Sequence, residues 1–231
     1  MFTNCAISGY SGFMESYGDN DNADIQVTAN GPYGKTITHT GKGGHFLFSG
    51  LGDGTYSLIF KKEGYGDVRR YNIQLFGSDT ARISQVLLFK MYNIPMPVLS
   101  NVRVESNPRY GGQDHPAVVI ETTMPPTNPL PGPLPIVLYT DTVKSVSYKS
   151  YTFIYPYLNA ANSDRGGGKI DFVFNPGGIF PYKKGTIVYF QAYVANPDEY
   201  RSGYFDSYLG VQQLSTLIPD RHSEVLSFIM P

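Results

Sequence analysis

Residues 44–60 have the sequence GHFLFSGLGDGTYSLIF, which contains two short strand patterns separated by a glycine-rich turn. Phe46 and Phe48 alternate with other residues, and so do Tyr56 and Leu58, which puts each pair on one face of a strand. Glycine supplies the positive φ angles that tight turns between strands need. The segment therefore predicts closely spaced strands with buried aromatic faces.

The same alternation recurs along the chain without helical periodicity between the runs. Pro95 and Pro97 interrupt it, and two prolines so close together favour an extended connection. We therefore expect an all-β fold of two consecutive antiparallel β-sandwich domains, at 6–92 and 97–231. In the first domain the predicted strands are 24–28, 36–40, 45–48, 55–60, 71–76 and 83–89. In the second they are 102–105, 117–121, 136–139, 151–155, 169–174, 186–194 and 225–230.

The composition excludes several classes of protein. Charged residues make up 16% of the 231 residues, against roughly 25% in an average soluble protein. A single Cys excludes a disulfide framework. The net charge of −1, from 18 basic and 19 acidic residues, gives no electrostatic footprint for nucleic acid, so we expect no nucleic-acid partner.

The first domain resembles the carboxypeptidase regulatory-like module, a transthyretin-like β-sandwich. The resemblance runs from about Ile7 to Phe89 and depends on three motifs: Gly-x-Phe-x-Phe at 44–48, Leu-x-x-Gly-Thr-Tyr-x-Leu at 51–58, and Gly-Tyr at 64–65. The second domain resembles a fibronectin type III or Ig-like sandwich with long loops. That resemblance depends on 185–196, which is similar to the penultimate strand of that fold.

The resemblance to the regulatory-like module implies no catalytic residues. It implies an accessory or adhesive role, as in exported proteins of the Gram-negative cell envelope that are lipid-anchored or attached to outer-membrane uptake systems. The sequence itself contains no Gly-x-Ser-x-Gly elbow, no His-Glu-x-x-His motif and no phosphate-binding loop. We therefore expect no enzyme activity and no cofactor.

Cys5 lies directly before the first strand-like stretch, and two interpretations of it stay open. It resembles the lipidated first residue of a bacterial lipoprotein, which would be the only link of this chain to a membrane. Alternatively, Cys5 is a buried free thiol.

Metal sites are weakly indicated. Asp19, Asp21 and Asp24 form an oxygen-rich cluster that could bind Ca²⁺, although Asp residues also dominate ordinary turns. His39 and His45 flank a glycine-rich hairpin and could face each other across it, but no third ligand is placed beside them. The alternative for both histidines is an ordinary polar strand position.

Tyrosines outside the predicted strands are the best candidates for ligand binding. A Tyr ring can stack on a sugar or anchor a protein partner while its hydroxyl forms a hydrogen bond. The alternative is that these rings pack beneath their own loops. The four-residue spacing in the long loop 196–223 also fits one face of a short helical turn. The candidates are Tyr200, Tyr204, Phe205 and Tyr208 in that loop, and Tyr155 and Tyr157 at a strand end.

These observations favour a non-catalytic binding or scaffolding protein of the bacterial cell envelope, with a glycan or an outer-membrane protein as partner. A structural or adhesive subunit of a surface assembly is the first alternative, because exposed strand edges permit strand addition. A hydrolase with an unrecognised site is the second.

Overall fold

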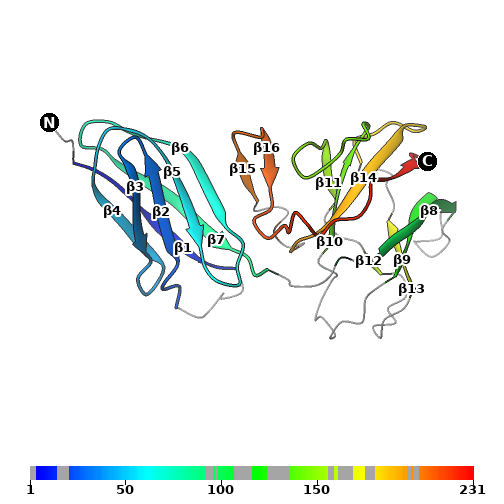
Figure 1. The fold of residues 1–231 in the computed structure, drawn as a ribbon, viewed down its shortest axis with the longest axis horizontal. Coiled ribbons are helices and arrows are strands. Elements are labelled where there is room, and N and C mark those ends of the chain that lie inside the picture. The colour runs from blue at the N-terminus through cyan, green and yellow to red at the C-terminus, as the bar shows by residue number, and fades with distance from the viewer. Residues whose placement is uncertain are drawn as a thin grey trace. The chain divides into compact units, whose positions relative to one another are not determined.

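The fold is that of a computed structural model, which describes residues 4–14, 21–91, 96, 98–106, 116–123, 136–155, 159–160, 169–174, 180–196, 199 and 203–231. Its secondary structure consists of β-strands (Figure 1). Within the described residues, none forms a helix long and apolar enough to cross a bilayer. The predicted all-β sandwich class is confirmed.

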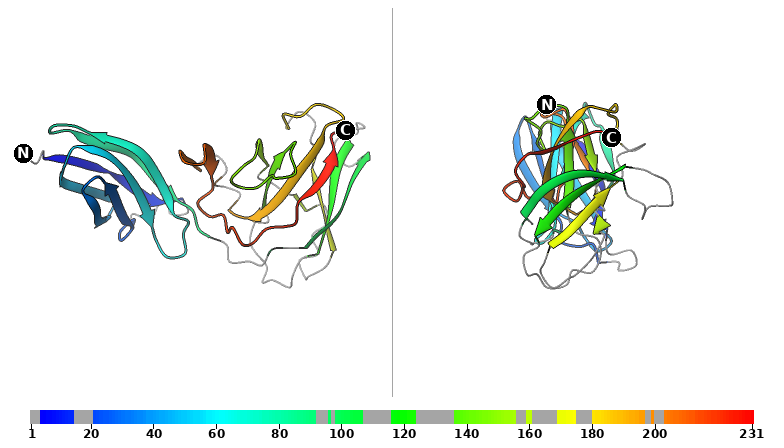
Figure 2. Two further views of the ribbon diagram at one scale, coloured as in Figure 1. Left: turned by 45° about the horizontal axis from the view of Figure 1, so that its top comes forward. Right: turned by 90° about the vertical axis from the view of Figure 1, so that its right-hand side faces the viewer.

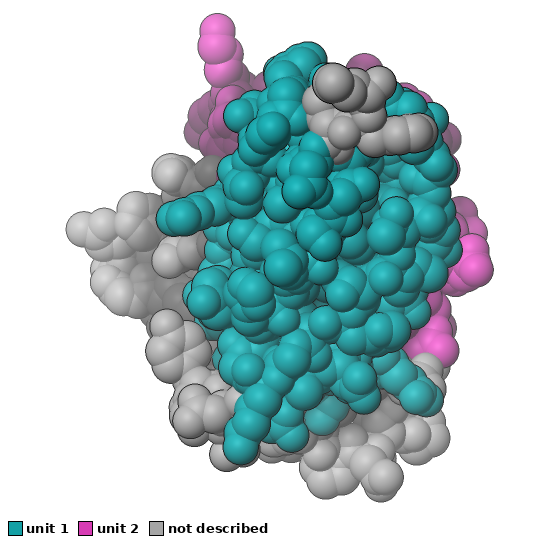
Figure 3. Space-filling view, turned by 90° about the vertical axis from the view of Figure 1, so that its left-hand side faces the viewer, with its two compact units in different colours: residues 1–91, 201–216 teal, residues 92–200, 217–231 magenta. Residues whose placement is uncertain are grey.

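The chain forms two compact units. Unit 1 comprises Met1–Met91 and Arg201–Thr216, and unit 2 comprises Tyr92–Tyr200 and Leu217–Pro231 (Figure 3). Arg201–Thr216 thus belongs to the unit that the N-terminal part of the chain forms, and the domain bounds 6–92 and 97–231 stay a prediction.

Unit 1 contains a three-stranded and a four-stranded sheet. The first has the order β4-β1-β7 and the second the order β3-β2-β5-β6. All pairings in them are antiparallel except that of β1 with β7, which is parallel. The bounds are β1 Cys5–Phe13, β2 Gln26–Gly31, β3 Gly34–His39, β4 His45–Leu51, β5 Gly54–Lys61, β6 Val68–Leu75 and β7 Thr80–Leu88.

The core of unit 1 is built from the alternating residues that the sequence indicated. Phe46 and Phe48 of β4 are buried, and so are Tyr56 and Leu58 of β5. Phe46 contacts Phe60 edge-on, with ring centroids 5.4 Å apart. Since β4 and β5 belong to different sheets, these rings join the two layers, which Figure 2 shows from two further sides.

The turn between β3 and β4 crosses from one sheet to the other. His39 and His45 at its two ends therefore belong to different sheets, which agrees with the alternative that both are ordinary polar strand residues. β3 pairs only with β2, whereas β4 pairs with β1. His39 is exposed on its edge strand, and the His45 ring packs edge-on against Tyr10 at 5.2 Å.

Unit 2 contains two four-stranded sheets, with the orders β11-β10-β14-β17 and β12-β13-β9-β8. A core that includes Ile120, Leu138, Phe190 and Phe228 lies between them. The bounds are β8 Val98–Ser106, β9 Pro116–Thr123, β10 Ile136–Asp141, β11 Phe153–Tyr155, β12 Asn159–Ala160, β13 Lys169–Phe174, β14 Ile187–Val194 and β17 Leu226–Ile229.

The long loop predicted at 196–223 contains a β-hairpin. Strand β15 (Tyr204–Asp206) pairs with β16 (Val211–Gln213), and a turn connects them. The helical turn suggested by the tyrosine spacing is therefore wrong. Gly210, with φ of 71°, and a hydrogen bond from its amide to the carbonyl of Asp206 at 2.8 Å close the turn instead.

Candidate functional site

Asp206 shapes the turn of the β15–β16 hairpin. Its Oδ1 accepts hydrogen bonds from the backbone amides of Tyr208 at 2.9 Å and Leu209 at 3.2 Å. The residue is only 8% exposed. A carboxylate that accepts hydrogen bonds from two amides of the following turn stabilises that turn strongly, because charge-assisted hydrogen bonds are stronger than neutral ones.

The same carboxylate connects the hairpin to β6 of the first sandwich. The hydroxyl of Tyr71 donates to Oδ2 of Asp206 at 3.4 Å, and Nη1 of Arg69 donates to the Tyr71 hydroxyl at 3.4 Å. The hydrogen bond to Tyr71 raises the pKa of Arg69, so this guanidinium stays charged. Tyr204 packs against the core of unit 1, and thus the hairpin is held by both polar and apolar contacts.

Tyr208 is the most exposed large side chain of the hairpin, at 87%. Its ring nevertheless contacts Tyr71 edge-on, with a centroid distance of 5.6 Å and an interplanar angle of 84°. Tyr71 is half-buried and also lies 6.5 Å from the ring of Tyr204. An aromatic ring that is exposed and yet positioned by its neighbours offers a free face to a ligand at low entropic cost.

A β-bulge lies beside this aromatic pair. In the β5–β6 ladder, Tyr56 pairs with Ile73 and Leu58 pairs with Arg70, so Tyr71 and Asn72 together oppose Ser57. Asn72 has φ of 59°, in the left-handed region that few residues other than glycine adopt. Bulges re-aim side chains and are over-represented next to functional sites.

A cleft of about 560 Å³ lies at this point, within the range of small-ligand sites. It is formed by the end of β2, the start of β5, the bulge of β6 and the turn of the hairpin. Its lining residues are Asn30, Gly31, Thr55, Tyr56, Ser57, Tyr71, Asn72, Ser207 and Tyr208.

Most of the polar side chains in the cleft are unengaged. Tyr56 donates its hydroxyl to the carbonyl of Gly52 at 2.9 Å, and burial is the main cause of its raised pKa. By contrast, five lining side chains have no hydrogen-bond partner within the described residues. These are Asn30, Thr55, Ser57, Asn72 and Ser207.

The predicted aromatic candidates have different surroundings. Of the hairpin residues, Tyr208 lines the cleft, Tyr204 packs against the core of unit 1, and Phe205 is 62% exposed but does not line the cleft. Tyr155 packs against the core of unit 2, its ring stacked 5.4 Å from that of Phe180. Tyr157 and Tyr200 lie outside the described residues.

Cys5 lies at the start of β1 with its side chain fully buried in the core of unit 1. Its Sγ is 3.2 Å from the carbonyl oxygen of Gly77 and 3.5 Å from Oδ1 of Asp53. A lipid on this sulfur would require Cys5 to leave the position that it occupies here.

The weak calcium candidates lie in a turn. Oδ1 of Asp21 accepts a hydrogen bond from the amide of Ala23 at 3.3 Å, and Asp24 has a left-handed φ of 64°. Asp19 lies outside the described residues. In the part of the chain that the structure describes, no three His, Cys, Asp or Glu side chains are grouped as a metal site.

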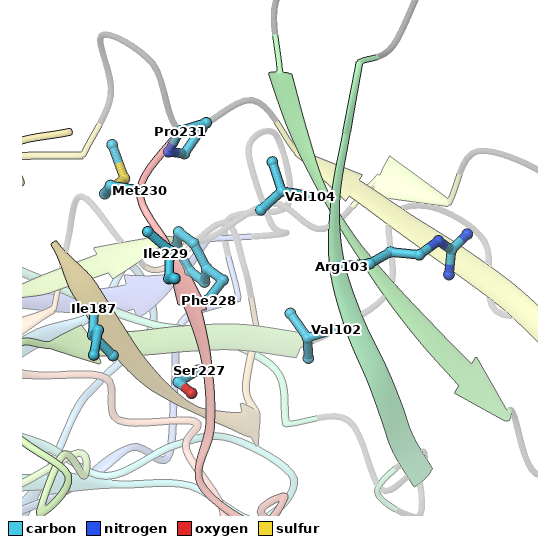
Figure 4. A pocket seen from close by; sticks show the side chains of 9 residues that line it. All are labelled: Val102, Arg103, Val104, Ile187, Ser227, Phe228, Ile229, Met230 and Pro231. Atoms are coloured by element: carbon cyan, nitrogen blue, oxygen red, sulfur yellow. The ribbon is translucent and has the colours of Figure 1, made fainter. Parts of the chain in front are cut away.

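An apolar groove of about 640 Å³ lies on unit 2, between the edge strands β8 and β17. Figure 4 shows the side chains that line it. Val104, Ile187 and Ile229 are exposed there. Its lining residues are Val102, Arg103, Val104, Ile187, Ser227, Phe228, Ile229, Met230 and Pro231.

Comparison with known proteins places the chain in no established family. No protein-family model and no curated protein matches the sequence. A solved structure from Bacteroides uniformis, described as a "putative carbohydrate binding protein", is 11% identical, with 98% of this chain and 99% of that chain covered and a TM-score of 0.30. A DUF3823 family protein from Parabacteroides merdae is 13% identical over 99% of this chain and 100% of that one, at a TM-score of 0.27. The minor pilin GBS52 from Streptococcus agalactiae is 15% identical over 42% and 49% of the two chains, at a TM-score of 0.31.

Sequence reasoning found Tyr208 but missed the residues that face it. Tyr71, Asn72 and Ser57 all fall within predicted strands, where regular alternation gave them no special role. The one available signal was Asn72, because Asn tolerates a left-handed backbone better than most residues.

Proposed function

We propose that the protein is a non-catalytic binding protein of the bacterial cell envelope, and that it binds a glycan in the cleft beside the β15–β16 hairpin. The observation that carries this proposal is the contact of exposed Tyr208 with Tyr71 beside a cleft in which five polar side chains have no hydrogen-bond partner among the described residues. The similarities to solved structures have TM-scores near 0.3, so the proposal rests on the geometry of this chain.

A sugar ring has an apolar C–H face and a rim of hydroxyl groups. An exposed aromatic ring can cover the first, and neutral amides and hydroxyls can form hydrogen bonds with the second. Because Asp206 holds the hairpin turn, Tyr208 would lose little further freedom when a ligand binds.

Binding without hydrolysis fits the chemistry of the cleft. Glycoside hydrolysis normally uses two carboxyl groups that flank the scissile bond. The described residues that line the cleft include no Asp, Glu or His. The carboxylate of Asp206 is occupied by two backbone amides and the Tyr71 hydroxyl.

The test is isothermal titration calorimetry of the protein with five oligosaccharides: maltohexaose, cellohexaose, xylohexaose, mannohexaose and an oligogalacturonate. For a sugar that binds, Tyr208→Ala should reduce the affinity at least about tenfold, the effect expected of an exposed aromatic anchor. Tyr10→Ala is the matched control, since Tyr10 is also exposed on unit 1 but belongs to the other sheet. Equal affinities for wild type and Tyr208→Ala would contradict the proposed site.

A second candidate function, as a subunit of a surface assembly, is favoured by the edge of unit 2. The amide of Met230 donates to the carbonyl of Thr186, so the backbone of Met230 faces β14. In an antiparallel ladder the backbone N–H and C=O groups of successive residues point to opposite sides of the strand. The backbone groups of Ile229 and Ser227 therefore point away from β14. β17 is an edge strand beside the apolar groove. An extended peptide strand of a partner protein could pair with this edge.

Analytical ultracentrifugation over a range of concentrations tests this second candidate. If copies of the chain assemble through the groove, Ile229→Lys should abolish their association, because the ammonium group would be buried in an apolar contact. Val143→Lys is the control, as Val143 is similarly exposed but lies outside the groove. A monomeric wild type at all concentrations would contradict self-assembly.

A further inference from the structure

The bulge of β6 and the absence of charged residues from the cleft lining narrow the chemical class of the ligand. We propose that the glycan is an uncharged oligosaccharide and that Asn72 is a specificity-determining residue that forms hydrogen bonds with its hydroxyl groups. This inference rests on the proposed glycan-binding function.

The cleft has no side chain that would neutralise an anionic sugar. Its lining residues include no Lys, Arg or His, and no Asp or Glu. Two cations stand beside the lining without belonging to it. Arg69 donates to the hydroxyl of Tyr71, which also donates to Asp206, and Lys35 of β3 is the registered partner of Asn30. A uronate or sulfate group in the cleft would lose water without gaining a cation from the lining residues, and that desolvation is unfavourable. An uncharged hexose or pentose oligomer carries no such penalty.

The polar side chains form a row across three strands. Asn30 of β2 is the registered partner of Ser57 of β5, and Ser57 in turn opposes Tyr71 and Asn72 of β6. Side chains of directly paired residues lie on the same face of a sheet. Together with Tyr71 and Asn72, which also line the cleft, the row presents two amides and a hydroxyl next to an aromatic ring, and such groups can form hydrogen bonds with vicinal hydroxyl groups.

Asn72 is more than the structural residue of a bulge. The backbone conformation, with φ of 59°, permits an asparagine but does not require its amide, because glycine would adopt it without steric cost. The side chain is exposed and has no hydrogen-bond partner within the described residues. A primary amide offers two donors and one acceptor oxygen, which matches a pair of sugar hydroxyls that each donate and accept.

The left-handed backbone conformation of Asn72 allows its side chain to be removed without strain in the backbone. Asn72→Gly removes the amide and keeps the backbone conformation available. Relief of the left-handed strain and the greater freedom of the unfolded chain oppose each other, so the melting temperature should change little. The affinity for a neutral hexasaccharide that binds the wild type should fall roughly three- to tenfold, as expected for the loss of one or two neutral hydrogen bonds. Asp24→Gly is the matched control, since Asp24 has a similar φ of 64° and lies outside the cleft.

The possible results separate this inference from the proposed function. If Tyr208→Ala loses binding but Asn72→Gly binds as tightly as the wild type, the role of Asn72 is wrong and the glycan site stands. If the oligogalacturonate binds more tightly than every neutral hexasaccharide, the uncharged class is wrong. If no oligosaccharide of either kind binds, the proposed function fails, and this inference fails with it.

Discussion

Replacement of Asp206 should detach the hairpin from β6. In Asp206→Ala, the amides of Tyr208 and Leu209 lose a charged acceptor, and the Tyr71 hydroxyl loses its partner. A hydrogen bond to a charged group contributes roughly 1.5–3 kcal/mol. Because water can reach the turn, we take the lower value for each of the two amides, which gives about 3 kcal/mol.

Native-state hydrogen exchange measures this loss at the site itself. A change of about 3 kcal/mol should make the amides of Tyr208 and Leu209 exchange roughly a hundredfold faster. Asp206→Asn should lose much less, because its side-chain oxygen still accepts from the turn. Asp220→Ala, at an exposed position, serves as the control. Equal exchange rates at Tyr208 in Asp206→Ala and wild type would refute the role of Asp206 in positioning the hairpin.

Three further predictions concern the two units. Cys5 should not react with Ellman's reagent in the native state and should react fully in denaturant, because its side chain is buried; rapid native labelling would contradict that burial. Gly44→Ala should destabilise the protein by at least about 2 kcal/mol, since the new Cβ would lie 1.9 Å from the carbonyl oxygen of Ser11. Gly77→Ala, with nothing within 4 Å, should cost only about 1 kcal/mol, so equal losses in urea unfolding would argue against the Ser11 clash. Finally, burial raises the pKa of Tyr193 above its ordinary value near 10. The unfolded state then ionises first, so the contribution of Tyr193 to the free energy of unfolding should be constant below about pH 10 and should fall as the pH rises further. Tyr193→Phe should reduce that fall, and an unchanged slope would contradict the assignment.

The strands that build the core of unit 1 could be predicted from the sequence because one face of each is buried. Phe46 and Phe48, or Tyr56 and Leu58, follow the two-residue period that a half-buried strand imposes. Which strands pair with one another was harder to predict than the strands themselves. The turn at Gly41–Gly44 has the composition of a hairpin, yet it connects two different sheets, and local sequence does not distinguish these cases.

The candidate site could be predicted only in part. The tyrosines of the 196–223 loop were identified as exposed aromatics, but their four-residue spacing wrongly suggested a helical turn. Tyr71 and Asp206 are 135 residues apart, and no local pattern indicates that they meet. The β6 bulge was also missed, because the alternation of buried and exposed residues in the sequence does not indicate where a strand contains one extra residue.

The central claim is that a glycan binds between β6 and the hairpin turn. Backbone amide chemical shifts, followed by NMR while a binding neutral hexasaccharide is titrated into the labelled protein, test it most directly. The proposed site predicts that the largest changes occur at Ser57, Asn72, Ser207 and Tyr208, which line the cleft. Largest changes at Ser227–Met230, or elsewhere outside the cleft, would contradict it.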